Sequence, residues 1–246
     1  MPGTRRIRAI IFDFNGVIAD DETPHLLCFQ SALAEHGLSL SKDEYYGTYL
    51  GMDERSCATA LLIARDGRCD PAIHASITAR KADLFRDYTA LHKPALFPGV
   101  VDFVRQAGKI CRLAVASGGR REQILHALGD TPVERAFELI VSADDCSAGK
   151  PEPAIYEYTL RLLNARAPKP PLLRADECLV IEDSRAGIQA GLRAGMPVLA
   201  LATTYPAAQL GEATLVFPSL QGASPEQVIE EIERAVVTQP KGLALH

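Results

Sequence analysis

The stretch Arg8-Ala-Ile-Ile-Phe-Asp13-Phe-Asn15-Gly16-Val-Ile-Ala-Asp20 decides the fold. Its apolar run, 9–12, is short enough for a buried parallel strand, and Asp13 follows where that strand should end. Gly16 then permits a tight turn. A carboxylate at the carboxyl end of a central strand faces the crevice where open α/β sheets bind ligands. Asp-x-Asn-Gly alone could also be an ordinary turn, so the rest of the chain has to decide.

Length and composition indicate a globular protein. The chain has 246 residues, which suits one large domain or a core with an insertion. It is 47% hydrophobic and 23% charged with a net charge of −5, so no basic surface for nucleic acid or an anionic membrane is expected. We find neither a signal-peptide segment nor an apolar stretch of membrane-spanning length, and we expect a cytoplasmic protein. The sequence leaves the oligomeric state open, and a monomer fits it.

The six cysteines are widely spaced and form no Cys-x-x-Cys pair. This spacing favours small buried thiols in a reducing compartment over a zinc site.

From about residue 21 to residue 93 every pattern is helical. Ser41-Lys-Asp-Glu44 has the form of a capping box, Asp70-Pro71 that of an N-cap followed by proline, and Gly37 and Gly67 that of helix stops. Helices are therefore expected over 23–35, from 41, over 53–65 and from 70. No strand candidate interrupts them.

After residue 94 helical and strand patterns alternate. Strands are predicted at 9–12, 112–117, 137–142, 178–183 and 198–202, and helices at 100–107, 122–128, 153–163, 184–194 and 225–237. Such alternation forms a parallel sheet with helices on both faces. We therefore predict an α/β fold: a Rossmann-like core of residues 1–20 and 94–246, with an all-helical cap, 21–93, inserted after the first strand. Linkers near 19–23 and 93–99 would let the cap open and close.

Polar side chains follow four of these strands or their loops, and the carboxyl ends of parallel strands meet at one edge. They are Asp13 and Asn15, then Ser117, then Lys150, then Glu182 with Asp183. Three carboxylates in one place repel one another, so a hard divalent cation is expected, with Mg²⁺ the natural one. Lys150, the Ser117 hydroxyl and the Gly118 N–H add charge and donors, which indicates a phosphate site containing a carboxylate nucleophile. Singly, each residue could be a strand-end cap, a solvated lysine or a helix cap.

A set of motifs spans nearly the whole chain. They are Phe12-Asp13-Phe-Asn15-Gly16-Val-Ile-Ala-Asp20 with Glu22 and His25, Phe97-Pro98-Gly99, Ala116-Ser117-Gly118, Gly149-Lys150-Pro151-Glu152-Pro153, and Ile181-Glu182-Asp183-Ser184-Arg185-Ala186-Gly187-Ile188. By these motifs the chain resembles the haloacid dehalogenase superfamily of phosphohydrolases. The resemblance is to the branch with a helical cap after the first strand, which includes β-phosphoglucomutases and phosphoglycolate phosphatases.

The resemblance implies a role for each matched residue. Asp13 would be the nucleophile that forms an aspartyl-phosphate, while Ser117 and Lys150 would bind the transferring phosphoryl group. Asp183 would ligate Mg²⁺ with Asp13 and the backbone carbonyl of Asn15. Glu182 would be a further ligand or would orient the others. The substrate would be a small phosphorylated metabolite such as a sugar phosphate.

Asn15 departs from the family pattern. Phosphatases of the family carry a second aspartate there, which protonates the leaving oxygen and then activates water. Asparagine cannot shuttle a proton, and loss of a general acid/base costs ~10²–10⁴ in rate. Binding of phosphate and metal should survive, whereas turnover should fall.

Three explanations of Asn15 stay open. The first is that the chain is an engineered trap variant of an active phosphatase. The second is that Asp21 or His25 carries the proton instead, and the third is that the protein binds phosphate without efficient hydrolysis. For Asp21 a helix-start cap is the simpler expectation. For His25 a solvent-facing helix position is one expectation, whereas the family resemblance places it facing the cap junction, where it would bind substrate. A mutase that keeps its phosphoryl-enzyme is the nearest alternative enzyme.

Substrate identity lies in the cap. The candidates, which the sequence does not rank, are Gly51, Met52, Asp53, Glu54, Arg55 and Lys81. Arg55 would contact an anionic substrate group or form a surface ion pair. Lys81 is expected on a solvated face.

Overall fold

A parallel six-stranded sheet forms the core of the molecule. The computed structural model describes residues 7–50, 52–167 and 170–238. The strand order is β5-β4-β1-β6-β7-β8, and every pairing is parallel. The strands are β1 (Ala9–Phe12), β4 (Arg112–Ala116), β5 (Leu139–Val141), β6 (Cys178–Glu182), β7 (Val198–Leu201) and β8 (Leu215–Phe217). The predicted sheet is confirmed, and β8 is one strand more than the sequence indicated.

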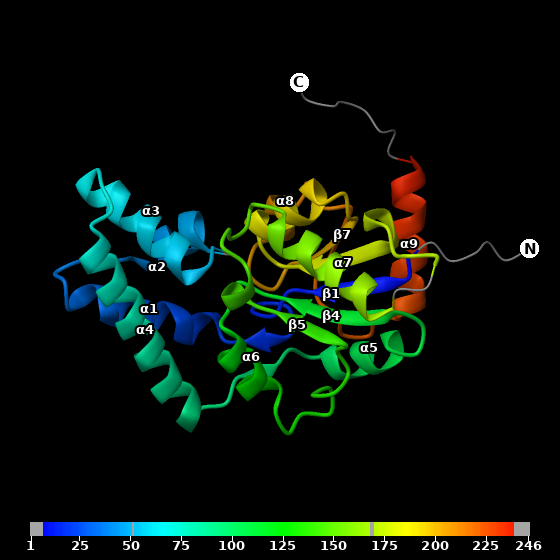
Figure 1. Cartoon of the computed structure of the whole chain (residues 1–246), viewed down its shortest axis with the longest axis horizontal. Helices are drawn as coiled ribbons and strands as arrows, with labels where there is room; N and C mark the ends of the chain where they lie inside the picture. The colour runs from blue at the N-terminus through cyan, green and yellow to red at the C-terminus, as the bar shows by residue number, and fades with distance from the viewer. Residues whose placement is uncertain (1–6, 51, 168–169, 239–246) are drawn as a thin grey trace, which may run out of the picture.

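Helices cover both faces of the sheet (Figure 1). One face carries α5 (Val100–Ala107), α6 (Arg121–Leu128) and α9 (Pro225–Thr238), and the other carries α7 (Ala154–Arg166) and α8 (Arg185–Arg193). Successive side chains of β1 point to opposite faces, so Ile10 and Phe12 join the first layer while Ala9 and Ile11 join the second. Burial on both faces explains the unbroken apolar run.

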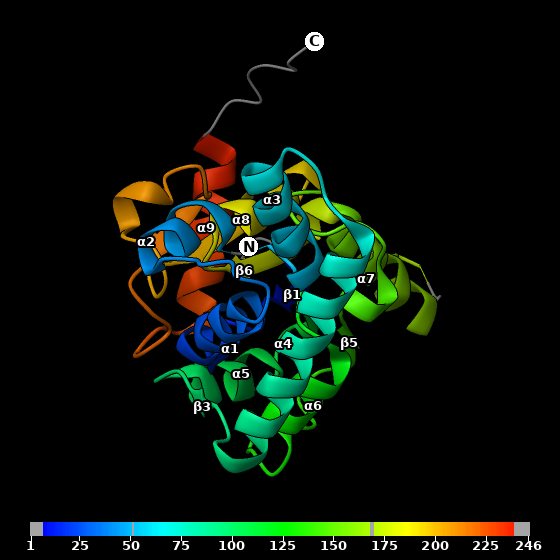
Figure 2. The same ribbon diagram turned by 90° about the vertical axis from the view of Figure 1, so that its left-hand side faces the viewer.

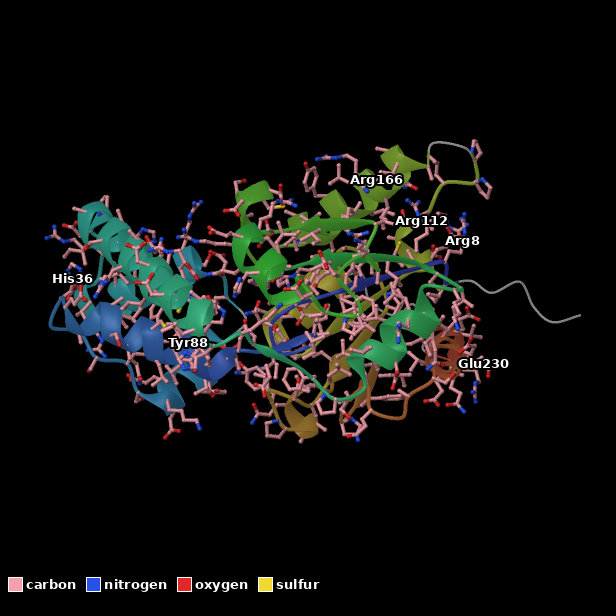
Figure 3. All side chains as sticks on the ribbon, turned by 90° about the horizontal axis from the view of Figure 1, so that it is seen from below. Arg8, His36, Tyr88, Arg112, Arg166 and Glu230 are labelled. Atoms are coloured by element: carbon pink, nitrogen blue, oxygen red, sulfur yellow. The ribbon has the colours of Figure 1, made fainter. Side chains whose placement is uncertain are left out.

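The cap is helical, as predicted, and lies at one end of the molecule. It consists of α1 (Glu22–Ala34), α2 (Lys42–Glu44), the π-helical turn η1 (Tyr45–Tyr49), α3 (Glu54–Asp66) and α4 (Pro71–Leu91). Figure 2 looks at the molecule from the cap side, where α4 packs beside α1 and α3. In Figure 3, His36 and Tyr88 mark the cap, whereas Arg112 and Glu230 mark the core.

Helices of the cap begin and end at the capping signals that the sequence predicted. Ser41 and Glu44 form both hydrogen bonds of the capping box. The carboxylate of Asp70 accepts two backbone N–H groups of α4, and Gly67 ends α3 in the left-handed conformation. The helix that starts at Ser41 is short, because it continues as a single π turn.

The two linkers between cap and core pair with each other, which the sequence did not indicate. β2 (Ala19–Asp20) and β3 (Ala95–Leu96) form a two-stranded antiparallel sheet. The N–H of Phe97 extends it by donating to the carbonyl of Ile18 at 3.0 Å. Both linkers therefore leave the core side by side. Three 3₁₀ turns complete the core: η2 (Ala143–Asp145), η3 (Ala175–Glu177) and η4 (Ala207–Gln209).

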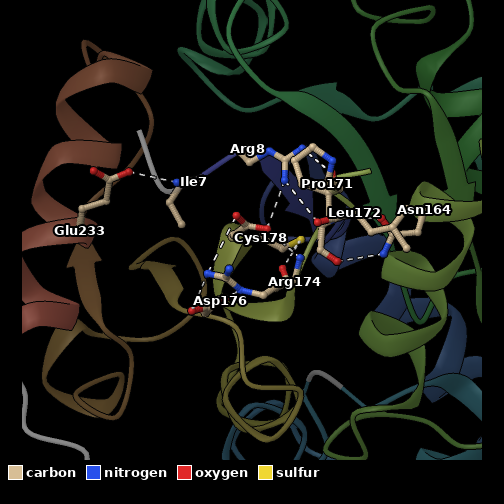
Figure 4. Close-up of polar contacts among 11 residues, drawn as sticks. Ile7, Arg8, Asn164, Pro171, Leu172, Arg174, Asp176, Cys178 and Glu233 are labelled. Atoms are coloured by element: carbon tan, nitrogen blue, oxygen red, sulfur yellow. Dashed lines mark hydrogen bonds and ion pairs between the residues drawn. The ribbon is translucent and has the colours of Figure 1, made fainter. Parts of the chain in front are cut away.

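Side chains from other elements hold the amino end of β1 (Figure 4). Glu233 on α9 accepts the N–H of Ile7 at 3.0 Å. The guanidinium of Arg8 donates to the carbonyls of Pro171 and Leu172, at 2.9 and 3.3 Å. β1 is thus fixed at the end opposite to Asp13.

All six cysteines are thiols rather than disulfides, and four of them are buried, as the sequence analysis expects for small buried thiols. Within the described residues, the helices are too short or too polar to cross a membrane.

Gly99 allows a close approach that other residues would block. Its φ is +86°, and an added Cβ would lie 2.5 Å from the Cα of Gln221. Gly222 has a similar φ of +74° but open space around it. We expect Gly222→Ala to lower the free energy of unfolding by about 1–2 kcal/mol through backbone strain alone. Gly99→Ala should lower it by about 2–5 kcal/mol, because overpacking adds to the strain. Urea denaturation measures both, and equal losses would contradict the clash.

Candidate active site

A cavity lies between the carboxyl edge of the sheet and the cap. It encloses about 690 Å³ of space, its open mouth included. The lining residues that matter below come from both parts of the molecule: Asp13, Asn15, Ser117, Gly118, Lys150 and Asp183 from the core, and Glu22, His25, Glu54 and Lys81 from the cap. The four strand-end groups that the sequence indicated therefore converge.

Lys150 lies between two buried carboxylates. Its Nζ is 2.5 Å from Oδ1 of Asp13 and 2.6 Å from Oε1 of Glu182. Burial opposes the charge on Lys150, but Asp13 and Glu182 outweigh it and raise the pKa of the lysine well above its usual range. Lys150 therefore presents a fixed positive charge to the cavity.

Glu182 is occupied by protein donors on both oxygens. Oε1 accepts from Lys150 and from the hydroxyl of Tyr156, the latter at 2.8 Å. Oε2 accepts the N–H groups of Asp183 and Ser184, both at 3.0 Å. This favours a role in positioning Lys150 over a role as a metal ligand. The sequence analysis missed Tyr156, although its place on the buried face of α7 could have pointed to it.

Asp13, Glu182 and Asp183 form a carboxylate cluster. Each presents an oxygen within 4.8 Å of the others. Burial raises the pKa of Asp13 to about 7, with Lys150 opposing and Glu182 adding to the shift. Burial and the charges of Glu182 and Asp13 raise the pKa of Asp183 well above its usual value. Three carboxylates with one lysine, which pairs with Asp13 and Glu182, are under-neutralised, and a divalent cation fits that deficit.

The turn after β1 brings the backbone against Asp183. Gly16 has a φ of +76°, and an added Cβ would lie 2.0 Å from Oδ2 of Asp183. Only glycine permits this approach, which brings the backbone of residues 15–16 beside the carboxylate cluster.

Ser117 and Gly118 line the cavity at the end of β4. The hydroxyl of Ser117 accepts the N–H of Gly119 at 3.0 Å and lies 3.4 Å from Oδ1 of Asn15. Ser117 therefore caps the strand end and also faces the site. Gly118 lies against Asp53 of the cap: a Cβ added at Gly118 would lie 3.5 Å from the Cβ of Asp53.

The amide of Asn15 connects the core to the cap. Its Nδ2 donates to Oδ2 of Asp21 at 2.8 Å and lies 2.8 Å from Nε2 of His25. The expectation that Asp21 caps α1 is wrong, because its side chain makes no cap hydrogen bond and binds the amide instead. The solvent-facing expectation for His25 is also wrong, since its ring is buried and stacks on Phe85 at 4.0 Å.

Lys81 is buried, which corrects the expectation of a solvated face. It is 1% exposed, forms an ion pair with Glu54, and its Nζ lies 2.6 Å from Nδ1 of His25. The carboxylate of Glu54 provides the charge that makes this burial tolerable. Ile77 and Phe85, four residues to either side on α4, share its buried face and were a usable signal.

The other cap candidates divide between the cavity and its surroundings. Met52 and Glu54 line it. Asp53 instead caps α3 by accepting the N–H groups of Arg55 and Ser56, each at 3.0 Å. Arg55 is exposed and lines a neighbouring hollow rather than this cavity, and Gly51 lies outside the described residues.

Replacing Lys150 tests the charge cluster. Lys150→Met keeps the volume and leaves Asp13 and Glu182 as unpaired buried carboxylates, so we expect a loss of about 3–5 kcal/mol in the free energy of unfolding at pH 8. Lys109→Met, at an exposed position, should change it by less than about 0.5 kcal/mol. Urea denaturation without added metal measures both. A loss at Lys150 as small as at Lys109 would show that the three charges do not depend on one another.

Comparison with known proteins agrees with this geometry. The sequence profile of the haloacid dehalogenase-like hydrolases matches residues 10–201. Protein CbbY of Cupriavidus necator is 31% identical over 227 residues, which are 87% of this chain and 86% of CbbY. A phosphorylated carbohydrates phosphatase of Thermotoga maritima is 26% identical over 195 residues, or 77% of this chain and 82% of that protein.

One similar solved structure contains a sugar ligand. It is an aspartate-to-asparagine variant of CbbY from Rhodobacter sphaeroides in complex with xylulose-1,5-bisphosphate, with a TM-score of 0.73 and 25% identity. The match covers 87% of this chain and 95% of that one. The family profile, the capped parallel sheet and the relatives agree, and the chain belongs to the haloacid dehalogenase-like hydrolases.

Proposed function

We propose that this protein is a magnesium-dependent phosphohydrolase that acts on a small sugar phosphate through an aspartyl-phosphate at Asp13, with turnover slowed by Asn15. The observation that carries the proposal is the buried Asp13–Lys150–Glu182 cluster beside the cavity, which Ser117 and Asp183 also line. A phosphatase of phosphorylated carbohydrates among the relatives supports the substrate class.

In this proposal Asp13 is the nucleophile. Its free carboxylate oxygen attacks phosphorus, and the bond from phosphorus to the leaving oxygen breaks. Lys150, 2.5 Å from the other oxygen, orients the carboxylate and offsets the charge of the incoming phosphate. The hydroxyl of Ser117 and the N–H of Gly118 lie beside Asp13 in the cavity and would donate to the phosphoryl oxygens.

The residues present fit a magnesium ion. Asp13 and Asp183 are the two carboxylates whose pKa burial raises, and the backbone carbonyl of Asn15 is the third protein ligand that the family resemblance implies. A bound Mg²⁺ would neutralise charge between the carboxylate and the phosphate.

The leaving oxygen needs a proton that Asn15 cannot give. Of the two alternatives that the sequence offered, His25 lines the cavity and Asp21 does not. Nδ1 of His25 faces the ammonium of Lys81, whereas Nε2 lies 2.8 Å from the amide nitrogen of Asn15 and 3.4 Å from Oδ2 of Asp21. The ammonium and the amide are donors, so a proton on Nε2 has the Asp21 carboxylate as its acceptor. This arrangement makes His25 the better-placed proton carrier, with Asp21, 3.4 Å away, orienting it.

Metal affinity should distinguish Glu182, the last residue of β6, from Asp183, which follows it. We expect Asp183→Asn to weaken Mg²⁺ binding by about 100-fold or more, because it removes a charged ligand. Glu182→Gln should weaken it by about tenfold at most, because its oxygens already accept protein donors. Isothermal titration calorimetry with MgCl₂ measures both. An equal loss in the two variants would make Glu182 a ligand.

Restoring the carboxylate at position 15 tests the cause of slow turnover. We expect Asn15→Asp combined with Asp21→Ser to raise hydrolysis of p-nitrophenyl phosphate by about 10²–10⁴. Asn15→Asp alone should gain less, because its carboxylate would lie about as close to Asp21 as the amide does, and the two would share a proton. Phosphate release with Mg²⁺ measures the rates.

Asp21→Ser alone is the control and should give no gain. The intact mass of the native chain should be checked as well, because Asn15-Gly16 is prone to deamidation. Unchanged hydrolysis in the double variant would contradict the proton-shuttle argument. Magnesium-dependent binding of phosphate without any hydrolysis would instead favour a non-hydrolysing binding protein.

A further inference from the structure

The cap contributes more negative than positive charge to the cavity. Glu22 of α1 and Glu54 of α3 line it, and Lys81 of α4 is the basic cap residue in its lining. This half of the cavity faces the nucleophile and would hold the part of the substrate that departs from the phosphate. Its charges therefore decide which leaving groups fit.

Two basic side chains near the cap half of the cavity pair with Glu54. Glu54 forms an ion pair with Lys81 through Oε1, and its Oε2 lies 3.5 Å from Nε of Arg120. Lys81 is 1% exposed and also contacts His25. A second phosphate or a carboxylate on the substrate would have to compete with Glu54 for Lys81, because Arg120 lines a neighbouring hollow rather than this cavity.

Glu54 retains one acceptor without a donor. Among the described residues, no hydrogen bond reaches its buried Oε2, since Arg120 approaches only as an ion pair. A buried carboxylate oxygen without a hydrogen bond is costly. Since Glu54 lines the cavity, its negative charge favours a substrate hydroxyl, which can donate to a carboxylate, and repels an anion.

The remaining wall suits the carbon face of a sugar. Phe29, Leu50 and Met52 line it with apolar atoms, and Tyr45 donates its hydroxyl to Glu22 at 2.5 Å. Apolar walls with a few precisely placed polar groups are typical of sites that bind small molecules.

We infer that the preferred substrate is a monophosphate whose leaving group carries hydroxyls and no second anion, and that Glu54 enforces this choice. The inference rests on the proposed phosphatase function and narrows it. It implies that a bisphosphate, such as the ligand in the structure of the CbbY variant, is disfavoured here. The reason is that Glu54 engages Lys81, the cation that a second phosphate would need.

Two substrates that differ at a single carbon test it. Sorbitol 6-phosphate ends in a hydroxymethyl group where 6-phosphogluconate ends in a carboxylate. We expect kcat/KM and binding affinity, the latter by calorimetry with Mg²⁺, to favour sorbitol 6-phosphate by about tenfold or more. Glu54→Gln should reduce this preference by about tenfold by freeing Lys81. Glu35→Gln, in an exposed ion pair on the cap surface, is the matched control and should leave it unchanged.

The outcomes separate this inference from the proposed function. Equal or reversed preference in the native chain overturns the inference, as does hydrolysis of p-nitrophenyl phosphate with neither sugar phosphate bound. A preference that persists unchanged in folded Glu54→Gln, verified by thermal unfolding, removes Glu54 from it. If neither the native chain nor the Asn15→Asp/Asp21→Ser variant hydrolyses p-nitrophenyl phosphate, the proposed function fails and the inference falls with it. The native preference needs no variant, so a misfolded Glu54→Gln leaves the test intact.

Discussion

The ion pair of Lys150 with Asp13 and Glu182 is the interaction on which the rest of the site depends. Three charges with almost no contact with water are tolerable only because each meets the others at hydrogen-bond distance. Their positions come from three segments: the ends of β1 and β6 and the loop before α7. The parallel pairing of β1 with β6 sets the first two, and Tyr156 and the backbone after β6 hold Glu182 so that Lys150 stays beside Asp13.

Asn15 makes sense only together with the cap. Its amide donates to Asp21, and a carboxylate in its place would meet a like charge at that distance. His25, Lys81 and Glu54 continue the chain of polar contacts from Asn15 through the cap interior. The amide of Asn15 in the core and the charged side chains of the cap therefore belong to one network across the boundary between core and cap.

The sequence predicted the elements whose signals are local. Apolar runs located five of the six core strands, and Ser41, Asp70 and Gly67 located cap helix ends. It missed β2 and β3, because strands of two residues leave no period to detect, and it also missed β8. It misplaced Lys81 and Asp21, because lysine and aspartate are usually exposed or capping. Glu54, the partner of Lys81, is distant in the sequence, and Asn15, the partner of Asp21, comes from a turn.

The sequence by itself determined the α/β core, the helical cap and the strand-end groups Asp13, Ser117, Lys150 and Asp183, because hydrophobic period and parallel connection leave one edge where such groups can meet. Only the tertiary structure decided that both oxygens of Glu182 accept protein donors and that Glu54 pairs with Lys81 and Arg120. Those facts depend on distances between segments that lie far apart in the chain but pack together in the fold. Side-chain charge in a buried cavity is set by such neighbours, and residue type alone does not reveal them.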